Sequence, residues 1–262
     1  MWPVLTIGSR GADVGNWQRF LRAHDISGDG ANPIAVDEAF GPITSNATRI
    51  WQAREGLALT GIVGRQDRVI ASTTLEAQGP PYIPFLQAQH YTPVYPKTRT
   101  IDLIVVHSMQ NQEKPDSAEN VALWFAGKST YTAPKASAHY CFDTDSAVQC
   151  VRDQDVAWQA AGANHNGIGL EHAGFARQTH DEWSDVTSAL ILDRSARLAA
   201  QLAIRYNIPL VKLAPDELKA GLRGFVGHVD CTIAFPGPGR THVDPGTGYP
   251  WQTYLENVRR YT

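Results

Sequence analysis

The chain has 262 residues, of which 43% are hydrophobic and 19% are charged, and its formal net charge is −3 at pH 7. This length predicts one large domain or two modest ones, and the composition excludes collagen-like and disordered chains. The chain has no block of like charges, so nucleic-acid binding is not expected. Its first residues do not resemble a signal peptide, so secretion by that route is not expected. No apolar run reaches the roughly 18 residues that cross a bilayer, so membrane insertion is not expected either.

The first part of the chain is predicted to be helical. Asp13 is expected to cap a first helix, a second helix is expected to begin near Thr44, and a third is predicted over residues 67–75. Three helices of this size can close one small core. Residues 1–76 are therefore predicted to form a helical domain, with core positions at helical spacing: Val14, Trp17, Leu21, Ala47, Ile50 and Trp51.

Three prolines within residues 78–84 predict an interdomain linker over residues 77–83. The second domain is then expected to span residues 84–262. Its first strand is predicted over residues 101–106, which are nearly all apolar, as in a strand that is covered on both faces.

Further elements follow in the second domain, and strands alternate with helices. Such alternation predicts a mixed α/β fold with a central sheet flanked by helices. The predicted elements are a helix capped by Ser117, a hairpin of residues 137–142 and 147–151, a strand over residues 168–171, and a long helix from Asp185 to about Asn207.

The three cysteines are too few for a disulfide scaffold. If Cys141 and Cys150 flank a hairpin that turns at residues 145–146, they fall opposite each other and close enough for a cross-strand bridge. Two reduced thiols are the favoured interpretation, because no signal peptide is visible. For Cys231, beside Asp230, an inert packing role is favoured over that of a nucleophile.

Residues that can bind a metal occur in three separate segments. His107 ends the apolar strand, where α/β sheets usually place their ligands. Far downstream follow His228, His242 and Asp244. Two imidazoles and one carboxylate, with a fourth position open to water, form a catalytic zinc set. Spacing alone does not decide this hypothesis, because no compact zinc motif is present.

A family resemblance is carried by residues 104–107, 137–140, 164–171, 227–228 and 244–246 of the second part of the chain, and by residues 8–14, 40–44, 51–52 and 56–57 of the first part. In chain order the segments of the second part resemble type-2 N-acetylmuramoyl-L-alanine amidases, which are zinc peptidoglycan hydrolases related to peptidoglycan-recognition proteins. The N-terminal part is similar to the helical peptidoglycan-binding module that is often fused to such enzymes, and the whole arrangement resembles endolysins of phages that infect actinobacteria.

The resemblance implies one Zn²⁺ per chain, held by His107, His228 and Asp244, with Glu171 as the catalytic acid and base. Successive residues of a strand face opposite sides of the sheet, so Glu171 and His172 cannot both face one cleft. His172 is therefore expected behind the sheet.

His242 departs from the family pattern, because many members have a lysine at this position. An imidazole there would stabilise the oxyanion in the same way. Alternatively, His242 would itself bind zinc, with Asp244 as its orienting partner, although Asp244 is favoured as the ligand. Nearby residues are expected to line the substrate groove (Trp158, Asn164 and Asn166, with a core role as the alternative for Trp158) or to be structural (His139 and His165).

The resemblance implies cleavage of the amide between N-acetylmuramic acid and the L-alanine of the stem peptide. Peptidoglycan is the expected partner, the N-terminal module is expected to raise the local substrate concentration, and the protein is expected to be a monomer. It is expected to be made in the host cytoplasm and to reach the cell wall through a holin pore. The alternatives are a protein that binds peptidoglycan without cutting it, and a host autolysin or wall-recycling amidase.

Overall fold

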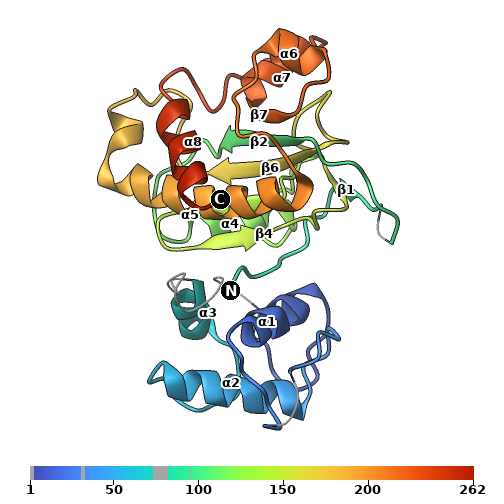
Figure 1. Ribbon diagram of the computed structural model, residues 1–262, viewed down its shortest axis with the longest axis vertical. Coiled ribbons are helices and arrows are strands. Elements are labelled where there is room, and N and C mark those ends of the chain that lie inside the picture. The colour runs from blue at the N-terminus through green and yellow to red at the C-terminus, as the bar shows by residue number, and fades with distance from the viewer. Residues whose placement is uncertain (1–2, 31–32, 73–81, 95) are drawn as a thin grey trace. The chain divides into compact units, whose positions relative to one another are not determined.

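The computed structural model describes residues 3–30, 33–72, 82–94 and 96–262 (Figure 1). The chain divides into two compact units, Met1–Phe85 and Leu86–Thr262. Residues 77–81 of the expected linker lie outside the described residues, so the linker and the expected domain boundaries stay predictions.

The N-terminal unit contains the helices α1 (Ala12–Ala23), α2 (Pro42–Arg54) and α3 (Arg65–Ser72). Helix α2 begins two residues earlier than expected, with a proline in its first turn, where the missing N–H is not needed. The indole of Trp17 meets that of Trp51 edge to face at 5.1 Å in the centre of the core, so the predicted apolar stripes are confirmed.

The prediction that Asp13 caps α1 is wrong. Gly11 is the N-cap residue, and no side chain caps this helix end. The carboxylate of Asp13 instead accepts hydrogen bonds from the Arg68 guanidinium, at 2.8 and 3.2 Å, and from the hydroxyl of Tyr82. Arg68 is only 4% exposed. Leaving a buried charge without a partner costs more free energy than leaving a helix end without a side-chain cap, so Asp13 pairs with Arg68.

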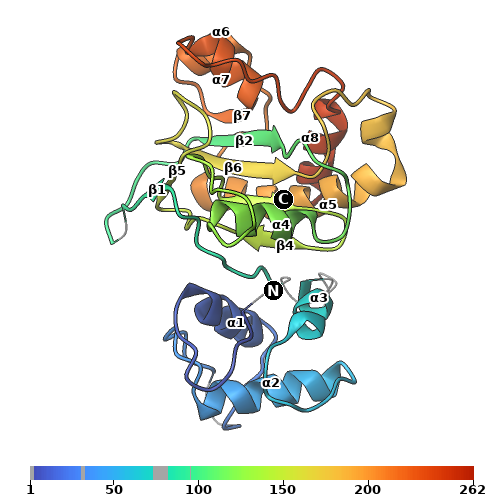
Figure 2. The ribbon, with the colours of Figure 1, turned by 180° about the vertical axis from the view of Figure 1, so that it is seen from behind.

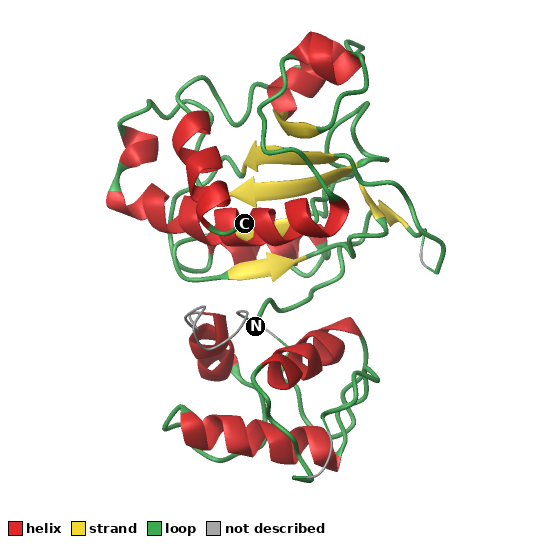
Figure 3. Ribbon diagram, in the orientation of Figure 1, coloured by secondary structure: helices red, strands yellow, loops and turns green. Residues whose placement is uncertain are grey.

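The C-terminal unit is built on a five-stranded sheet with the strand order β4-β3-β6-β2-β7. Figure 3 distinguishes the strands of this unit from its helices by colour. Strands β3, β6, β2 and β7 run parallel, and β4 is antiparallel to β3 at the edge. The mixed sheet confirms the predicted fold class. The strands span β2 (Leu103–Ser108), β3 (Tyr140–Phe142), β4 (Ala147–Gln149), β6 (Gly167–His172) and β7 (Gly224–Gly227), and a separate pair joins β1 (Tyr91–Thr92) to β5 (Val156–Ala157).

Helices cover both faces of this sheet. The helices α5 (Val186–Tyr206) and α8 (Trp251–Arg260) pack together on one face, and α4 (Ser117–Phe125) lies on the opposite face (Figures 1 and 2). Asp185 precedes α5 as predicted, and its side chain caps this helix by accepting a hydrogen bond from a backbone N–H three residues later. The helix ends at Asn207, which adopts the left-handed conformation typical of helix ends.

Other helices were mispredicted or missed. Ser117 is the first residue of α4 and not its cap, because its hydroxyl donates to the carbonyl oxygen of Gln112. The short helices η2 (Glu182–Ser184), α6 (Pro215–Lys219) and α7 (His228–Ala234) were not predicted, and neither was the C-terminal helix α8. Among the residues that the structure describes, no helix combines the length and the apolar character needed to cross a bilayer.

All three cysteines are buried free thiols. The residue directly opposite Cys141 in the hairpin is Val148, so the expectation that Cys150 lies opposite is wrong. Cys150 follows the last residue of β4, and its sulfur lies 3.9 Å from that of Cys141. The two sulfurs are not bonded, in line with the favoured interpretation of two reduced thiols, and the disulfide stays an untested alternative.

Candidate active site

The candidate site lies where three neighbouring parallel strands end. His107 is the fifth residue of β2 and is paired in register with Glu171 of β6. His228 follows directly after the last residue of β7, on the other side of β2. Parallel strands bring their carboxyl ends to the same edge of the sheet, which is where open α/β sheets bind ligands.

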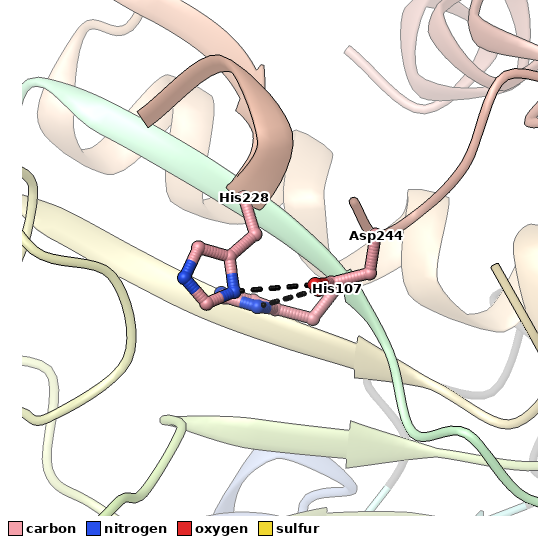
Figure 4. A group of neighbouring side chains, drawn as sticks. All are labelled: His107, His228 and Asp244. Carbon is pink, nitrogen blue, oxygen red and sulfur yellow. Dashed lines mark hydrogen bonds and ion pairs between the residues drawn. The ribbon is translucent and has the colours of Figure 1, made fainter. Parts of the chain in front are cut away.

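Asp244 completes a buried group with the two histidines (Figure 4). One carboxylate oxygen lies 3.1 Å from Nδ1 of His107, and the other lies 3.3 Å from Nδ1 of His228. One potential ligand atom from each residue lies within 4.8 Å of the other two. Imidazole nitrogen and carboxylate oxygen are zinc ligands, and three protein ligands are typical of a catalytic zinc site, so these residues fit a zinc ion.

The loop that carries Asp244 is held in place by its backbone. The carbonyl oxygen of Asp244 accepts a hydrogen bond of 2.9 Å from the N–H of Val229, at the start of α7. Two residues later, Gly246 has a φ of 96°, and a Cβ atom there would lie 1.9 Å from the carbonyl oxygen of Ala176. Only glycine fits this turn, and the turn directs Asp244 toward the strand ends.

Two of the three residues have the ionisation of a metal site, and His107 is the exception. Burial alone would lower the pKa of His107, but the hydrogen bond with Asp244 and the charges of Glu171 and Asp244 together raise it, so a metal ion would have to displace a proton from that ring. Burial alone would raise the pKa of Asp244, but hydrogen bonds with His107 and His228 hold it well below its usual range. Burial lowers the pKa of His228 to about 4, so this imidazole is neutral at physiological pH. An ionised carboxylate and a neutral imidazole are the forms that bind metal ions.

Glu171 lies beside this group with a carboxyl that is poised to exchange protons. Burial, assisted by the charge of Asp244 and opposed by that of His107, raises its pKa to about 7. Its Oε2 atom is buried and has no hydrogen-bond partner in the described structure. A carboxyl with a pKa close to the ambient pH is suited to act as both a general base and a general acid.

His172 lies on the opposite face of the sheet, as the strand alternation predicts. Its Nε2 is 2.6 Å from the hydroxyl oxygen of Ser195 on α5, and its Nδ1 is 3.2 Å from that of Tyr249. Burial lowers the pKa of His172 to about 3. It is therefore a neutral core residue, separated from Glu171 by the backbone of β6.

A cavity of about 450 Å³ opens beside His228. Trp158 and Asn164 line it, whereas Asn166 does not, and the expectation that these residues bind substrate stays a prediction. Trp158 is 39% exposed, so its alternative role in the core is wrong. The lining residues are Lys135, Ala136, Trp158, Gln159, Ala160, Ala161, Asn164, His228, Thr232, Gly239, Arg240 and His242.

His242 faces the cavity and lies outside the buried group. Its ring stacks on that of His228 with centroids 3.9 Å apart, and its side chain is 55% exposed. Its Nδ1 lies 3.6 Å from Asp244, which is farther than the corresponding atom of His107 or His228. The buried group therefore consists of Asp244 with His107 and His228, and His242 is not part of it.

Further residues support the site, and two of them were missed by sequence analysis. His139 is fully buried, and its Nδ1 accepts a hydrogen bond from the N–H of Gly169, which fits the expected structural role. The carbonyl oxygen of His165 accepts a hydrogen bond from Arg99 at 2.7 Å. Gln159, like Arg99, was not singled out, although its Oε1 lies 3.3 Å from Nε2 of His107. Nothing in the periodicity of a loop signals such a contact.

Comparison with known families agrees with this geometry. A family profile described as N-acetylmuramoyl-L-alanine amidase matches residues 97–247, which is more than half of the chain. The chain belongs to this amidase family. A second profile, for a peptidoglycan-binding domain, matches residues 10–66 of the amidase. The resemblances to the amidase and to the peptidoglycan-binding module are thereby confirmed.

Individual relatives of the amidase are distant. N-acetylmuramoyl-L-alanine amidase A of Achromobacter lyticus is 26% identical over 168 residues, covering 59% of this chain and 81% of the relative. Among solved structures, the Staphylococcus aureus hydrolase AmiA in complex with its ligand is 19% identical, with a TM-score of 0.49, and the match covers 68% of this chain and 80% of AmiA. A mutant endolysin from Bacillus subtilis is also 19% identical, with a TM-score of 0.40 and coverage of 67% and 99%.

Proposed function

We propose that this amidase hydrolyses the bond between N-acetylmuramic acid and the L-alanine of the peptidoglycan stem peptide. His107, His228 and Asp244 hold one Zn²⁺ ion, and Glu171 is the acid and base. The observation that carries this proposal is the convergence of three buried ligand atoms beside the carboxyl of Glu171, whose pKa is raised to about 7.

The metal site and Glu171 have separate roles in the proposed hydrolysis. A zinc ion bound there would act as a Lewis acid and make water available as a nucleophile near neutral pH. Glu171 accepts a proton as the water attacks the carbonyl carbon, and returns it to the nitrogen of the departing alanine. Because its Oε2 has no partner in the described structure, this carboxyl is free to turn toward either atom.

His242 and the cavity serve the substrate. The imidazole of His242 is exposed on the cavity wall and stacked on His228, so an N–H there can donate to the carbonyl oxygen as negative charge develops on it. Trp158 offers an exposed indole to the sugar or peptide, and its N–H is oriented by a hydrogen bond of 2.9 Å to Thr92.

The biological role that we propose is wall lysis by a phage endolysin. The match of residues 10–66 to a peptidoglycan-binding domain supports action on the intact wall, because a wall-bound unit raises the concentration of substrate around the catalytic unit. This feature favours a lytic enzyme over one that recycles soluble wall fragments. Peptidoglycan is the proposed partner, and a monomer released through a holin pore is the proposed active form.

Digestion of purified peptidoglycan, followed by mass analysis of the products, tests the proposed reaction. We expect stem peptides with a free N-terminal alanine, intact glycan strands and about one zinc ion per chain by metal analysis. Cut glycosidic bonds, cut cross-bridges or binding without products would contradict the proposal. For the endolysin role, expression in the host cytoplasm should cause lysis only when a pore-forming protein is also made.

A further inference from the structure

Gln159 connects His107 to the neighbouring strand. It lies in the loop after β5, partly buried at the wall of the cavity. Its Oε1 is 3.3 Å from Nε2 of His107, and its Nε2 donates a hydrogen bond of 3.0 Å to the carbonyl oxygen of Gly167 on β6. An amide can accept at one end and donate at the other, so both contacts are satisfied together.

The backbone around Gln159 is fixed independently of its side chain. The Oδ1 atom of Asn164 accepts hydrogen bonds from the N–H groups of Gln159 and Ala160, at 2.9 and 2.7 Å. One side chain thus ties down two successive N–H groups of this loop. The position from which the Gln159 side chain extends toward His107 is therefore determined by the loop itself.

Gly169 leaves the space that the Gln159 amide occupies. It lies on β6, two residues before Glu171, and a Cβ atom at this position would lie 2.0 Å from Oε1 of Gln159. Such an approach is far inside van der Waals contact, so any larger residue would displace the amide oxygen from His107. The backbone of Gly169 is extended, a conformation that any residue can adopt. Glycine is therefore needed here only because it leaves room for the Gln159 amide.

The direction of the hydrogen bond determines which nitrogen of His107 is available. The amide oxygen of Gln159 can only accept, so Nε2 of His107 carries a proton there, and without metal Nδ1 donates a second proton to the carboxylate of Asp244. Nδ1 is therefore the nitrogen that gives up its proton and offers its lone pair when a metal ion binds. We propose that Gln159 is a positioning residue that fixes the tautomer and the ring orientation of His107 for metal binding. This inference rests on the proposed zinc site.

Zinc affinity, measured by competition with a chelator, tests the inference without using turnover. Gln159→Met keeps the length of the side chain and removes both hydrogen bonds, and we expect it to weaken zinc binding by about 10–100-fold, as is usual when a partner of a ligand histidine is lost. The control is Gln252→Met, at an exposed position of α8, which should leave the affinity unchanged.

Two further measurements separate positioning from a general loss of structure. In the zinc-loaded protein, the Nε2 proton of His107 should exchange slowly with solvent in ¹H–¹⁵N spectra, and fast in Gln159→Met. Gly169→Ala should weaken zinc binding in the native background, but should have little effect in Gln159→Ala, where the colliding amide is absent. This non-additivity is expected only if Gly169 acts through Gln159.

The outcomes distinguish the inference from the function on which it rests. If the unaltered protein binds zinc and Gln159→Met binds it equally tightly, or if the His107 proton exchanges equally in both, the positioning role is wrong and the zinc site stands. If the unaltered protein binds no zinc, the proposed zinc site fails and the inference fails with it.

Discussion

Replacement of Glu171 by glutamine should lower activity strongly and at the same time stabilise the metal-free protein. Glutamine keeps the shape of the side chain but cannot accept the proton, so kcat should fall by about 10²–10⁴-fold, the usual contribution of a general acid or base. Zinc content should not change, because Glu171 is not one of the three converging ligands.

The gain in stability follows from the raised pKa. Burial raises the pKa of Glu171 from 4.5 to about 7, so the folded protein favours the protonated form. Stability is then fully present below pH 4.5 and is lost as the pH rises through 7. One pKa unit corresponds to about 1.4 kcal/mol, so ionisation costs the native protein up to about 3 kcal/mol at pH 8.

Glutamine avoids the cost of ionisation but leaves a buried amide group without a partner where Oε2 has none, which reduces the gain. We therefore expect the free energy of unfolding to rise by about 1–3 kcal/mol at pH 8 and hardly at all at pH 4. Hydrogen exchange of the β2 and β6 amides in the metal-free protein measures this difference, because these strands form the centre of the sheet. Glu256→Gln, at an exposed position of α8, is the control. Undiminished turnover would refute the catalytic role, and a gain independent of pH would refute the electrostatic reasoning.

Three further outcomes are expected. Asp13→Ala removes the carboxylate that faces the buried charge of Arg68, and it should destabilise the N-terminal unit by about 3–5 kcal/mol. Hydrogen exchange of the α1 and α3 amides measures this loss. The double variant Asp13→Ala/Arg68→Met, which removes the charge as well, should recover part of the lost stability. His172→Ala loses its contacts with Ser195 and Tyr249 and should lower the Tm while zinc content and kcat remain, and a loss of zinc would contradict its place behind the sheet. Removal of metal by a chelator should abolish product release from peptidoglycan, and added zinc should restore it; full activity of metal-free protein would exclude zinc catalysis.

The candidate site could be predicted because its residues lie at strand ends. The apolar segment before His107 predicted a buried strand, and the parallel neighbours of that strand bring Glu171 and His228 to the same level. The alternation of side chains along β6 then separated Glu171 from His172. The position of Asp244 came from the family resemblance, since nothing local shows that a loop 137 residues after His107 returns to it.

The failures have a common physical cause. Asp13 matches the composition of a helix cap, but its partner Arg68 is 55 residues away and outweighs the local preference. Gln159 depends on the space left by Gly169, and this space exists only after the loop has folded against β6. In both cases the decisive contact joins segments whose proximity no local pattern encodes.

The spacing of the three converging residues links metal binding to the completion of folding. Because the ligands lie on segments separated by 121 positions between His107 and His228 and by a further 16 before Asp244, partly assembled chains offer at most an incomplete chelate. Metal would then bind only to the folded protein. Each tenfold excess of the free ion concentration over the Kd would add about 1.4 kcal/mol to the free energy of unfolding. The supply of zinc would in this way influence how long the folded protein resists proteolysis.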